Sequence, residues 1–492
     1  YLGITDPAVR TPEQPLRGMD PYELYFTMHG LLTAHETWDD EAALKTAKNL
    51  GDYFVRHIGP GKAEFWPGEL RPPENVGETL GGHSAIAGHS VHYGWEGTLL
   101  IDPMLRLYEL TGDPKYLEWC QWVVSRIDVW SGHDAFSKLD KVAAGTLGIH
   151  EIQPYVHAHT FHMNFQGLLR LYQVTGDQSL FRKVAGAWRD VASRQMYITG
   201  GVSVGEHYEA GHHLPITGSV VETCASMSWI GLSQYLLELT GHPKYADAIE
   251  KLVWNHAFAT QTADGRSNRY HTPLNGMKPA GYSHGPDCCT ASGHRMLARL
   301  PSLAYGVGDD AVYVNQYIES RAEVNLPNGG TAELEMETDY PDGETIRINV
   351  SPDEPRRFAL KLRLPEWCDD PSVWVKGEER SSPEPGAYET ISRTWQDGDW
   401  VEIRLPMQIH RVEGTHTTEG RIALRQGPLV FALDTVWWTD RQREMLGRVP
   451  EDLGAVVGLV KDTLTLKTGP VGTKGPAYEA TVQLPSLEKI EV

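Results

Sequence analysis

Up to Leu303 the apolar residues recur at the three-to-four-residue spacing of amphipathic helices, and one helical unit is repeated. The unit occurs as PMLRLYELTGDPKYLEWC, GLLRLYQVTGDQSLFRKV and QYLLELTGHPKYADAIE, with a looser copy near HETWDDEAALKTA. Each of the three reads as a helix, a break at Thr111, Thr175 or Thr240, and a second helix. Because one helix pair cannot bury its apolar face alone, the repeat predicts stacked or circularly closed helix pairs.

Beyond Leu303 the pattern changes to alternating apolar and polar residues over short runs. Examples are AVYVNQYIES, TAELEMETDY, ETIRINVS, FALKLRLPEW, DWVEIRLPM and RIALRQGPLVFAL, which are separated by Gly, Pro, Asp and Asn. A period of two with regular turn residues predicts antiparallel β-sandwich modules. We therefore place the main domain boundary near residue 305 and a weaker one near 410, which gives domains 1–305, 306–410 and 411–492.

Composition narrows the classes of partner. The 44 basic and 65 acidic side chains give a net charge of −21, which opposes binding to nucleic acid or to anionic lipid. The sequence contains no apolar run of about 18 residues, so we expect no membrane span. The chain begins at Tyr1, which decides neither for nor against a signal peptide; the free thiols favour the cytoplasm, and a homodimer stays open.

The chain holds five cysteines, an odd number and too few for a disulfide scaffold. We expect Cys120, on an apolar helical stripe, and Cys368, at the end of a strand, to be buried thiols without a function. Cys288 and Cys289 are adjacent in HGPDCCTASGHR, and adjacent cysteines rarely bond to each other without strain. They are better suited to binding one metal ion together, or to an arrangement in which one sulfur reacts while the other holds a group in place.

A second motif, ETC, supplies Glu222 and Cys224 just before an apolar helical run. Together with Cys288 and Cys289 these residues offer three thiolates and one carboxylate, a donor set that favours tetrahedral zinc. The spacing does not match the familiar zinc fingers, so four unrelated buried groups or a purely structural zinc are the alternatives. Against a structural role stands a dense group of titratable residues nearby, namely Glu206, His207, Glu209, His212, His213, His284, Asp287, His294 and Arg295.

The motifs together resemble a known enzyme family. GEHY, LP and ETCAS are followed by CC, then by RMLARLPSLAYGVGDDAVYVNQYIES, and later by YPDGETIRI, LKLRLPEW, GAYETISRTWQDGDWVEIRLPM and RIALRQGPLVFAL. In this order they are similar to glycoside hydrolase family 127, whose members include β-L-arabinofuranosidases. The resemblance implies a mainly α fold with an (α/α)6 helical barrel followed by antiparallel β-sandwich domains. It also implies an exo-acting, retaining hydrolase that acts on a glycoside or oligosaccharide, with β-L-arabinofuranoside as the first candidate.

The resemblance further implies a role for individual residues. Zn²⁺ would be held by Glu222, Cys224, Cys288 and Cys289. Cys288 would be the nucleophile, because a metal-bound thiol loses its proton and the thiolate is the reactive form. Glu206 would be the general acid/base. The residues expected to contact the substrate are Tyr270, in RYHTPL, and, less securely aligned, His29 and His159.

Several positions depart from the family pattern. Thr98 stands where a histidine is common, His162 stands in place of an arginine, and Thr290, Ala291 and Ser292 replace Pro-Pro-Asn after the paired cysteines. These departures leave the sugar open, with a 3,6-anhydro-galactoside as an alternative. Two alternatives from other classes are a polysaccharide lyase, which the net charge disfavours, and a non-catalytic carbohydrate-binding protein with a structural zinc.

Overall fold

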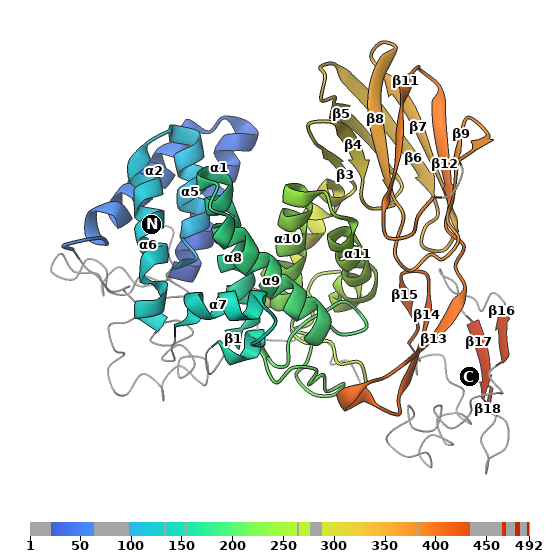
Figure 1. The fold of residues 1–492 in the computed structure, drawn as a ribbon, viewed down its shortest axis with the longest axis horizontal. Helices are drawn as coiled ribbons and strands as arrows, with labels where there is room; N and C mark the ends of the chain where they lie inside the picture. Colours follow the sequence, from blue (N-terminus) through green and yellow to red (C-terminus); the bar gives the residue numbers. More distant parts are fainter. Residues whose placement is uncertain are drawn as a thin grey trace.

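The computed structural model describes residues 21–62, 98–131, 134–152, 156–262, 265–275, 288–380 and 383–432, and three short strands nearer the C-terminus. Helices occupy the first part of the chain and β-sheets the second, as Figure 1 shows; the strand pairs of these sheets are antiparallel except for the parallel pair β4–β8. This order confirms the predicted change from helical to strand periodicity. The last helical turn ends at Leu303, and the first strand of the large sheets begins at Tyr305.

The described helices form hairpins. The pairs are α1 (Pro21–Trp38) with α2 (Glu41–His57), α5 (Ile101–Thr111) with α6 (Pro114–Ser131), α8 (Ala158–Thr175) with α9 (Gln178–Arg194), and α10 (Thr223–Thr240) with α11 (Pro243–Leu252). Three further helices are α7 (Ala135–Ala143), the single-turn α12 (Phe258–Thr260) and α13 (Cys288–Arg299). The three predicted breaks and the looser fourth copy are all confirmed as helix ends.

The Thr-Gly break has a simple physical cause, which the α8–α9 turn illustrates. The Thr175 hydroxyl donates to the carbonyl of Leu171 at 2.7 Å, and Gly176 follows in the left-handed region with φ 76°. Asp177 then accepts the amide of Ser179 at 2.9 Å and starts α9. Glycine adopts positive φ without strain, and aspartate satisfies a free amide at a helix start, so these few residues both end and restart a helix.

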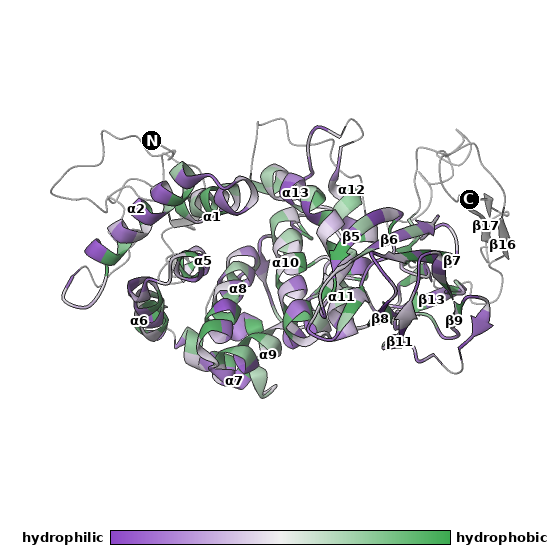
Figure 2. Ribbon diagram, turned by 90° about the horizontal axis from the view of Figure 1, so that it is seen from above, coloured by the Kyte–Doolittle hydropathy of each residue, from purple (hydrophilic) through white to green (hydrophobic). Residues whose placement is uncertain are grey.

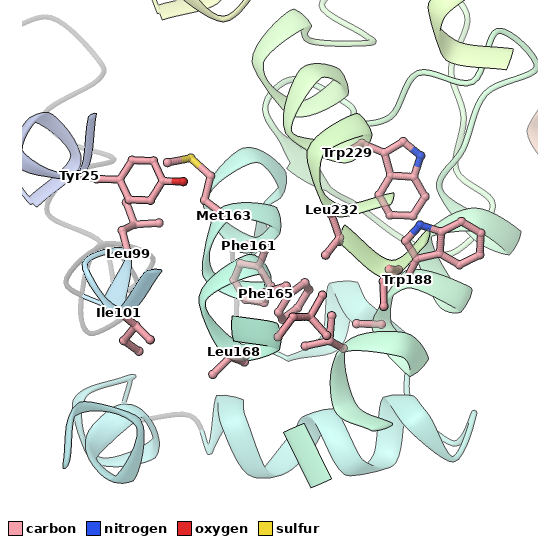
Figure 3. Close-up of a cluster of buried hydrophobic side chains, with 14 of the residues drawn as sticks. Tyr25, Leu99, Ile101, Phe161, Met163, Phe165, Leu168, Trp188, Trp229 and Leu232 are labelled. Carbon is pink, nitrogen blue, oxygen red and sulfur yellow. The ribbon is translucent and has the colours of Figure 1, made fainter. Parts of the chain in front are cut away.

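The hairpins close into a ring. Viewed from above in Figure 2, helices α1, α5, α8, α10 and α13 surround a common centre, while α2, α6, α9 and α11 lie outside them. Each inner helix packs on the next, and the Arg295 guanidinium of α13 lies 4.1 Å from the Phe26 ring centre of α1. Figure 3 shows the core on both sides of α8, where Phe161 and Phe165 are buried. Trp188 of α9 stacks on Trp229 of α10 at 5.2 Å.

Two sheets form the sandwich that follows. The first has the order β10-β9-β12-β7-β6-β5 and the second β11-β8-β4-β3. Their strands are β3 (Tyr305–Val307), β4 (Ala311–Val314), β5 (Ser320–Asn325), β6 (Thr331–Thr338), β7 (Thr345–Pro352), β8 (Arg356–Arg363), β9 (Ser372–Val375), β10 (Glu378–Glu379), β11 (Tyr388–Trp395) and β12 (Asp399–Arg404). Alternate residues such as Ile346, Ile348 and Val350 are fully buried between the sheets, as the period of two predicts.

Cys120 and Cys368 are both fully buried free thiols, as expected. The expected position of Cys368 was wrong, however, because β8 ends at Arg363 and the cysteine lies in the turn beyond it. Pro365 explains the difference, since it cannot donate a ladder hydrogen bond and the chain leaves the sheet before it.

A buried polar network joins the helices to the sandwich. Arg363 of β8 is fully buried and donates to the carboxylate of Asp247 at 2.6 Å and to that of Glu250, both on α11. Glu250 also accepts the Trp367 indole N–H at 2.9 Å and the Tyr340 hydroxyl at 2.6 Å. Every group in this network has a hydrogen-bond partner, and the single guanidinium of Arg363 faces two carboxylates.

A third sheet consists of β13 (Ile409–Glu413), β14 (Ile422–Gln426) and β15 (Leu429–Val430), and a fourth of β16 (Thr465–Thr468), β17 (Tyr478–Val482) and β18 (Ile490–Glu491). Asn255 ties the third sheet to the helices, donating to the Pro428 carbonyl at 2.8 Å and accepting the Val430 amide at 2.7 Å. Among the helices of the described ranges, none has the length and apolar character needed to span a bilayer.

Candidate active site

Four predicted metal ligands come from two helix N-termini. Glu222 is the residue that caps α10, Cys224 is its second residue, and Cys288 and Cys289 begin α13. The two helices pack side by side, which brings their first turns together. Glu222 is held from outside the helix, because its amide donates to the Ser203 hydroxyl at 3.1 Å and its backbone forms a β-bridge with His271. Helix N-termini favour anions, so this position suits thiolates and a carboxylate.

The four side chains converge on one point. Their ligand atoms all lie within 4.8 Å of one another, and the Cys289 sulfur is 3.6 Å from Oε1 of Glu222. Glu222, Cys224 and Cys289 are buried, whereas Cys288 is exposed. Oε2 of Glu222 is buried and has no hydrogen-bond partner among the described residues. A buried carboxylate oxygen without a donor is costly, and a cation at this point would remove the cost.

The electrostatics of the cluster distinguish Cys288 from the other thiols. Burial raises the pKa of Cys224 and of Cys289, and burial together with the Glu206 and Cys288 charges raises the pKa of Glu222 well above its ordinary value. Hydrogen bonds from the thiols of Cys224 and Cys289 instead lower the pKa of Cys288. Cys288 is therefore the sulfur that most readily carries the negative charge, and it is also the accessible one.

Glu206 lies beside this cluster, immediately before the short strand β2 (His207–Tyr208). Its side chain accepts a hydrogen bond from the Tyr270 hydroxyl, which itself lies 3.8 Å from the Cys288 sulfur. The other carboxylate oxygen is 3.6 Å from Nε2 of His157. Tyr270 thus stands between the predicted acid/base and the predicted nucleophile. Burial and the neighbouring Glu222 and Cys288 charges raise the pKa of Tyr270, so it remains a proton donor.

Sequence reasoning missed His157. Strand β1 (Val156–His157) pairs with β2 so that His157 stands opposite His207, next to Glu206. Its Nδ1 caps α8 by accepting the amide of Thr160 at 3.2 Å, which leaves the Nε2 side for the carboxylate. The alternation of histidines in YVHAHTFH was the available signal, since it occurs at the junction of a strand and a helix.

The two predicted substrate histidines differ in their surroundings. His159, on α8, is buried, and burial, His157 and Arg295 lower its pKa against the opposing influence of the Cys288 charge. The His159 ring centre lies 6.4 Å from that of His157, which neighbours Glu206. His29, on α1, lies 3.0 Å from the Asp102 carboxylate and 2.6 Å from the Arg106 guanidinium. Among the described contacts none joins His29 to Glu206 or to the cysteines.

Two of the positions that depart from the family pattern point into the protein. His162 is fully buried, with Nδ1 2.9 Å from the Ser228 hydroxyl and Nε2 hydrogen-bonded to the Tyr208 hydroxyl. The Thr98 hydroxyl is also buried and donates to the side chain of Asn164. Both side chains have their partners in the core, so neither supports the inference that they alter the sugar-binding surface.

The loop that follows Glu206 contacts the third sheet. Thr417, between β13 and β14, accepts the Leu214 amide at 2.9 Å and donates to the His212 carbonyl at 3.1 Å. The rings of His212 and His416 stack with centres 4.1 Å apart. Figure 1 shows this sheet reaching from the sandwich toward the loops beside α10. Segments about 200 residues apart thus meet at the loop that follows Glu206.

Comparison with known proteins agrees with these observations. Residues 90–302 match the model of the β-L-arabinofuranosidase GH127 catalytic domain, and residues 311–407 match that of the GH127 middle domain. A non-reducing end β-L-arabinofuranosidase of Bifidobacterium longum subsp. longum is 25% identical over 469 residues, covering 84% of this chain and 65% of the relative. The chain therefore spans less than two thirds of that curated relative's length.

Two solved structures share the fold. A GH127 β-L-arabinofuranosidase from Geobacillus stearothermophilus T6 has a TM-score of 0.72 and 23% identity, covering 98% of this chain and 78% of its own. A second GH127 β-arabinofuranosidase has a TM-score of 0.73 and 23% identity, with coverages of 96% and 72%. These similarities confirm the helical barrel followed by β-sandwich domains. With two domain models of one family matched in order, the chain belongs to glycoside hydrolase family 127.

Proposed function

We propose that this protein is a retaining glycoside hydrolase that removes a terminal β-L-arabinofuranose, with Cys288 as nucleophile and Glu206 as acid/base. The observation that carries the proposal is the Tyr270 hydroxyl, which hydrogen-bonds Glu206 and lies 3.8 Å from the Cys288 sulfur. Hydrolysis with retention of the anomeric configuration requires a nucleophile and an acid/base that flank the scissile glycosidic bond. The sugar is taken from the names of the curated and structural relatives.

Zinc is the cofactor that the cluster fits best. Glu222, Cys224, Cys288 and Cys289 would hold it, because three sulfurs and one carboxylate oxygen within 4.8 Å form a soft, four-donor set. When bound, the metal supplies the positive charge that keeps these buried thiols deprotonated at neutral pH. The unpartnered Oε2 of Glu222 supports this assignment, since it otherwise has no compensating donor in the described structure.

The reaction then proceeds in two displacements. The Cys288 sulfur attacks the anomeric carbon while Glu206 transfers its proton to the departing oxygen, and the sugar becomes attached to Cys288 through a C–S bond. In the second step Glu206 takes a proton from water, the water oxygen bonds to the anomeric carbon, and the C–S bond breaks to return the thiolate. Tyr270 holds Glu206 in place through both steps. The exposure of Cys288 gives the sugar access to its sulfur.

The test is turnover of aryl β-L-arabinofuranosides by the wild type and by Cys288→Ser. We expect the substitution to abolish release of the aryl group while leaving the circular dichroism spectrum unchanged, because a serine hydroxyl is not ionised at neutral pH. Cys120→Ser, in a buried thiol of α6, is the matched control and should retain activity. Full activity of Cys288→Ser would rule out the nucleophile, and release only from other sugars in a glycoside panel would rule out the arabinoside.

A second measurement isolates the covalent step. Intact mass spectrometry after rapid quenching should show the wild type carrying one added pentosyl unit, and peptide mapping should place it on Cys288. The unit should accumulate in Glu206→Ala with a substrate whose leaving group needs no protonation, because removal of the base slows the second step. A modification on any other residue would contradict the mechanism.

A further inference from the structure

A hydrogen-bonded chain of polar side chains on α13 reaches the cysteine cluster. The hydroxyl of Ser292 lies 3.3 Å from the Cys224 sulfur, and Ser292 is almost fully buried. The Arg295 guanidinium donates to the same hydroxyl oxygen at 2.8 Å. Ser292 belongs to the TASGHR segment, which departs from the family pattern after the paired cysteines.

The chemistry of the three groups fixes the direction of these bonds. A guanidinium only donates, so Arg295 occupies a lone pair of the Ser292 oxygen. A cysteine that ligates a metal is a thiolate and has no proton to give. The Ser292 hydroxyl must then donate its hydrogen to the Cys224 sulfur. Arg295 therefore donates to Ser292, and Ser292 donates to Cys224.

Helix geometry explains why the three residues can act together. Cys288, Ser292 and Arg295 are spaced by four and three residues on α13, which places them on one face of the helix. That face is turned toward α10, which carries Cys224. The guanidinium of Arg295 is held over the Phe26 ring at 4.1 Å, and in the described part of the chain no carboxylate forms an ion pair with it.

The net negative charge of the metal site explains why a hydroxyl and a guanidinium next to it would be stabilising. Three thiolates and one carboxylate carry four negative charges, whereas zinc brings two positive ones. A buried centre with excess negative charge is stabilised by a nearby cation and by hydrogen bonds to its sulfurs. The described contacts give Cys224 a hydroxyl at 3.3 Å, while the nearest hydroxyl recorded for Cys288 lies at 3.8 Å.

We propose that Ser292, oriented by Arg295, is a positioning residue that fixes Cys224 as a permanent ligand of the metal. The inference rests on the zinc site of the proposed function. Its consequence is a difference between the two sulfurs: the Ser292 hydroxyl at 3.3 Å would hold Cys224 as a ligand, whereas Cys288, whose nearest described hydroxyl is that of Tyr270 at 3.8 Å, would remain the accessible nucleophile.

The experiment measures zinc affinity of the purified full chain by competition with a chromophoric chelator. Ser292→Ala should bind zinc roughly 10–100-fold more weakly than the wild type, the range found when outer-shell partners of metal ligands are removed. Ser292→Thr keeps the hydroxyl and should restore most of the affinity. The matched control is Ser233→Ala, a buried serine of α10 whose hydroxyl accepts the Trp188 indole and lies outside the cluster; it should bind zinc like the wild type.

Cobalt(II) substitution provides a readout that a merely structural role would not move. Loss of a hydrogen bond to a thiolate raises the energy of its electrons, so the sulfur-to-cobalt charge-transfer band of Ser292→Ala should shift to longer wavelength, while that of Ser233→Ala should not. Equal zinc affinity and an unshifted band in Ser292→Ala would overturn the inference and leave the proposed function standing. A wild type that binds neither metal would overturn both the inference and the zinc assignment.

Discussion

Two glutamates of one loop show how surroundings decide the role of a residue. Glu206 accepts a hydrogen bond from Tyr270 and is mostly buried, whereas Glu209 pairs with His213 at the surface. Glu206→Gln should therefore lower kcat/KM by roughly 10²–10⁴-fold for a substrate with a poor leaving group, because the amide cannot donate a proton. Glu209→Gln is the control and should stay near the wild type. Comparable losses in both variants would argue against Glu206 as the acid.

His162 makes stability depend on pH. Burial lowers its pKa from 6.5 to about 3, so the folded protein keeps it neutral while the unfolded chain protonates it below about pH 6.5. Unfolded chains then bind more protons than folded ones, and stability falls as pH decreases toward 3. The Tm of the wild type should drop between about pH 7 and about pH 5. His162→Asn should be less stable at neutral pH but lose less on acidification; an unchanged loss would show that other groups dominate.

The part of the candidate site that could be predicted from the sequence consists of residues whose types are rare and chemically reactive. Cysteines are rare in this chain, so the pairing of ETC with CC stood out, and the fold brings all four side chains together. His157, Ser292 and Thr417 could not be found in this way. Each is a common residue that matters only because strand pairing or helix packing places it next to Glu206, Cys224 or the loop between them.

At the scale of the element, the turn between α8 and α9 depends on the backbone of one residue. Gly176 has φ 76° and no neighbour within 4 Å of a built Cβ, so Gly176→Ala introduces only backbone strain. We expect the variant to lose about 1 kcal/mol of stability. Gly30→Ala, at an exposed position inside α1 with equal space, should instead gain about 0.5–1 kcal/mol. Urea unfolding followed by circular dichroism distinguishes the two, and a shift in the same direction would contradict the explanation.

Elements of this kind were predictable because the signals are local. The Thr-Gly-Asp/His break combines a hydroxyl, a left-handed glycine and a helix cap within three residues, and it was correctly placed in the three copies that contain it. The end of β8 was not, because Leu364 beyond it is still buried and still hydrogen-bonded to Ala387, and the apolar pattern gives no sign that the chain turns away at Pro365. The period of the hydrophobic pattern indicates which side chains are buried, but it does not indicate where backbone pairing ends.

At the scale of the molecule, the buried network around Arg363 couples the helices to the sandwich. Glu250→Gln removes one of the two carboxylates that pair with the fully buried Arg363 and leaves Asp247 in place, so we expect a loss of about 1–3 kcal/mol in the free energy of unfolding. Glu333→Gln breaks the exposed pair with Arg321 and should cost less than about 1 kcal/mol. Thermal and guanidinium unfolding measure both. No measurable effect at Glu250 would mean that Asp247 alone compensates Arg363.

The contact of Thr417 with His212 and Leu214 also bears on how such a protein can evolve or be engineered. A shortened version that ends after the sandwich, near Met407, retains every residue assigned to the chemistry. It would nevertheless lose the hydrogen bonds that shape the loop after Glu206. The third sheet therefore cannot be exchanged without affecting the loop after Glu206. When segments are recombined among relatives, that loop and the β13–β14 turn should be taken from the same parent.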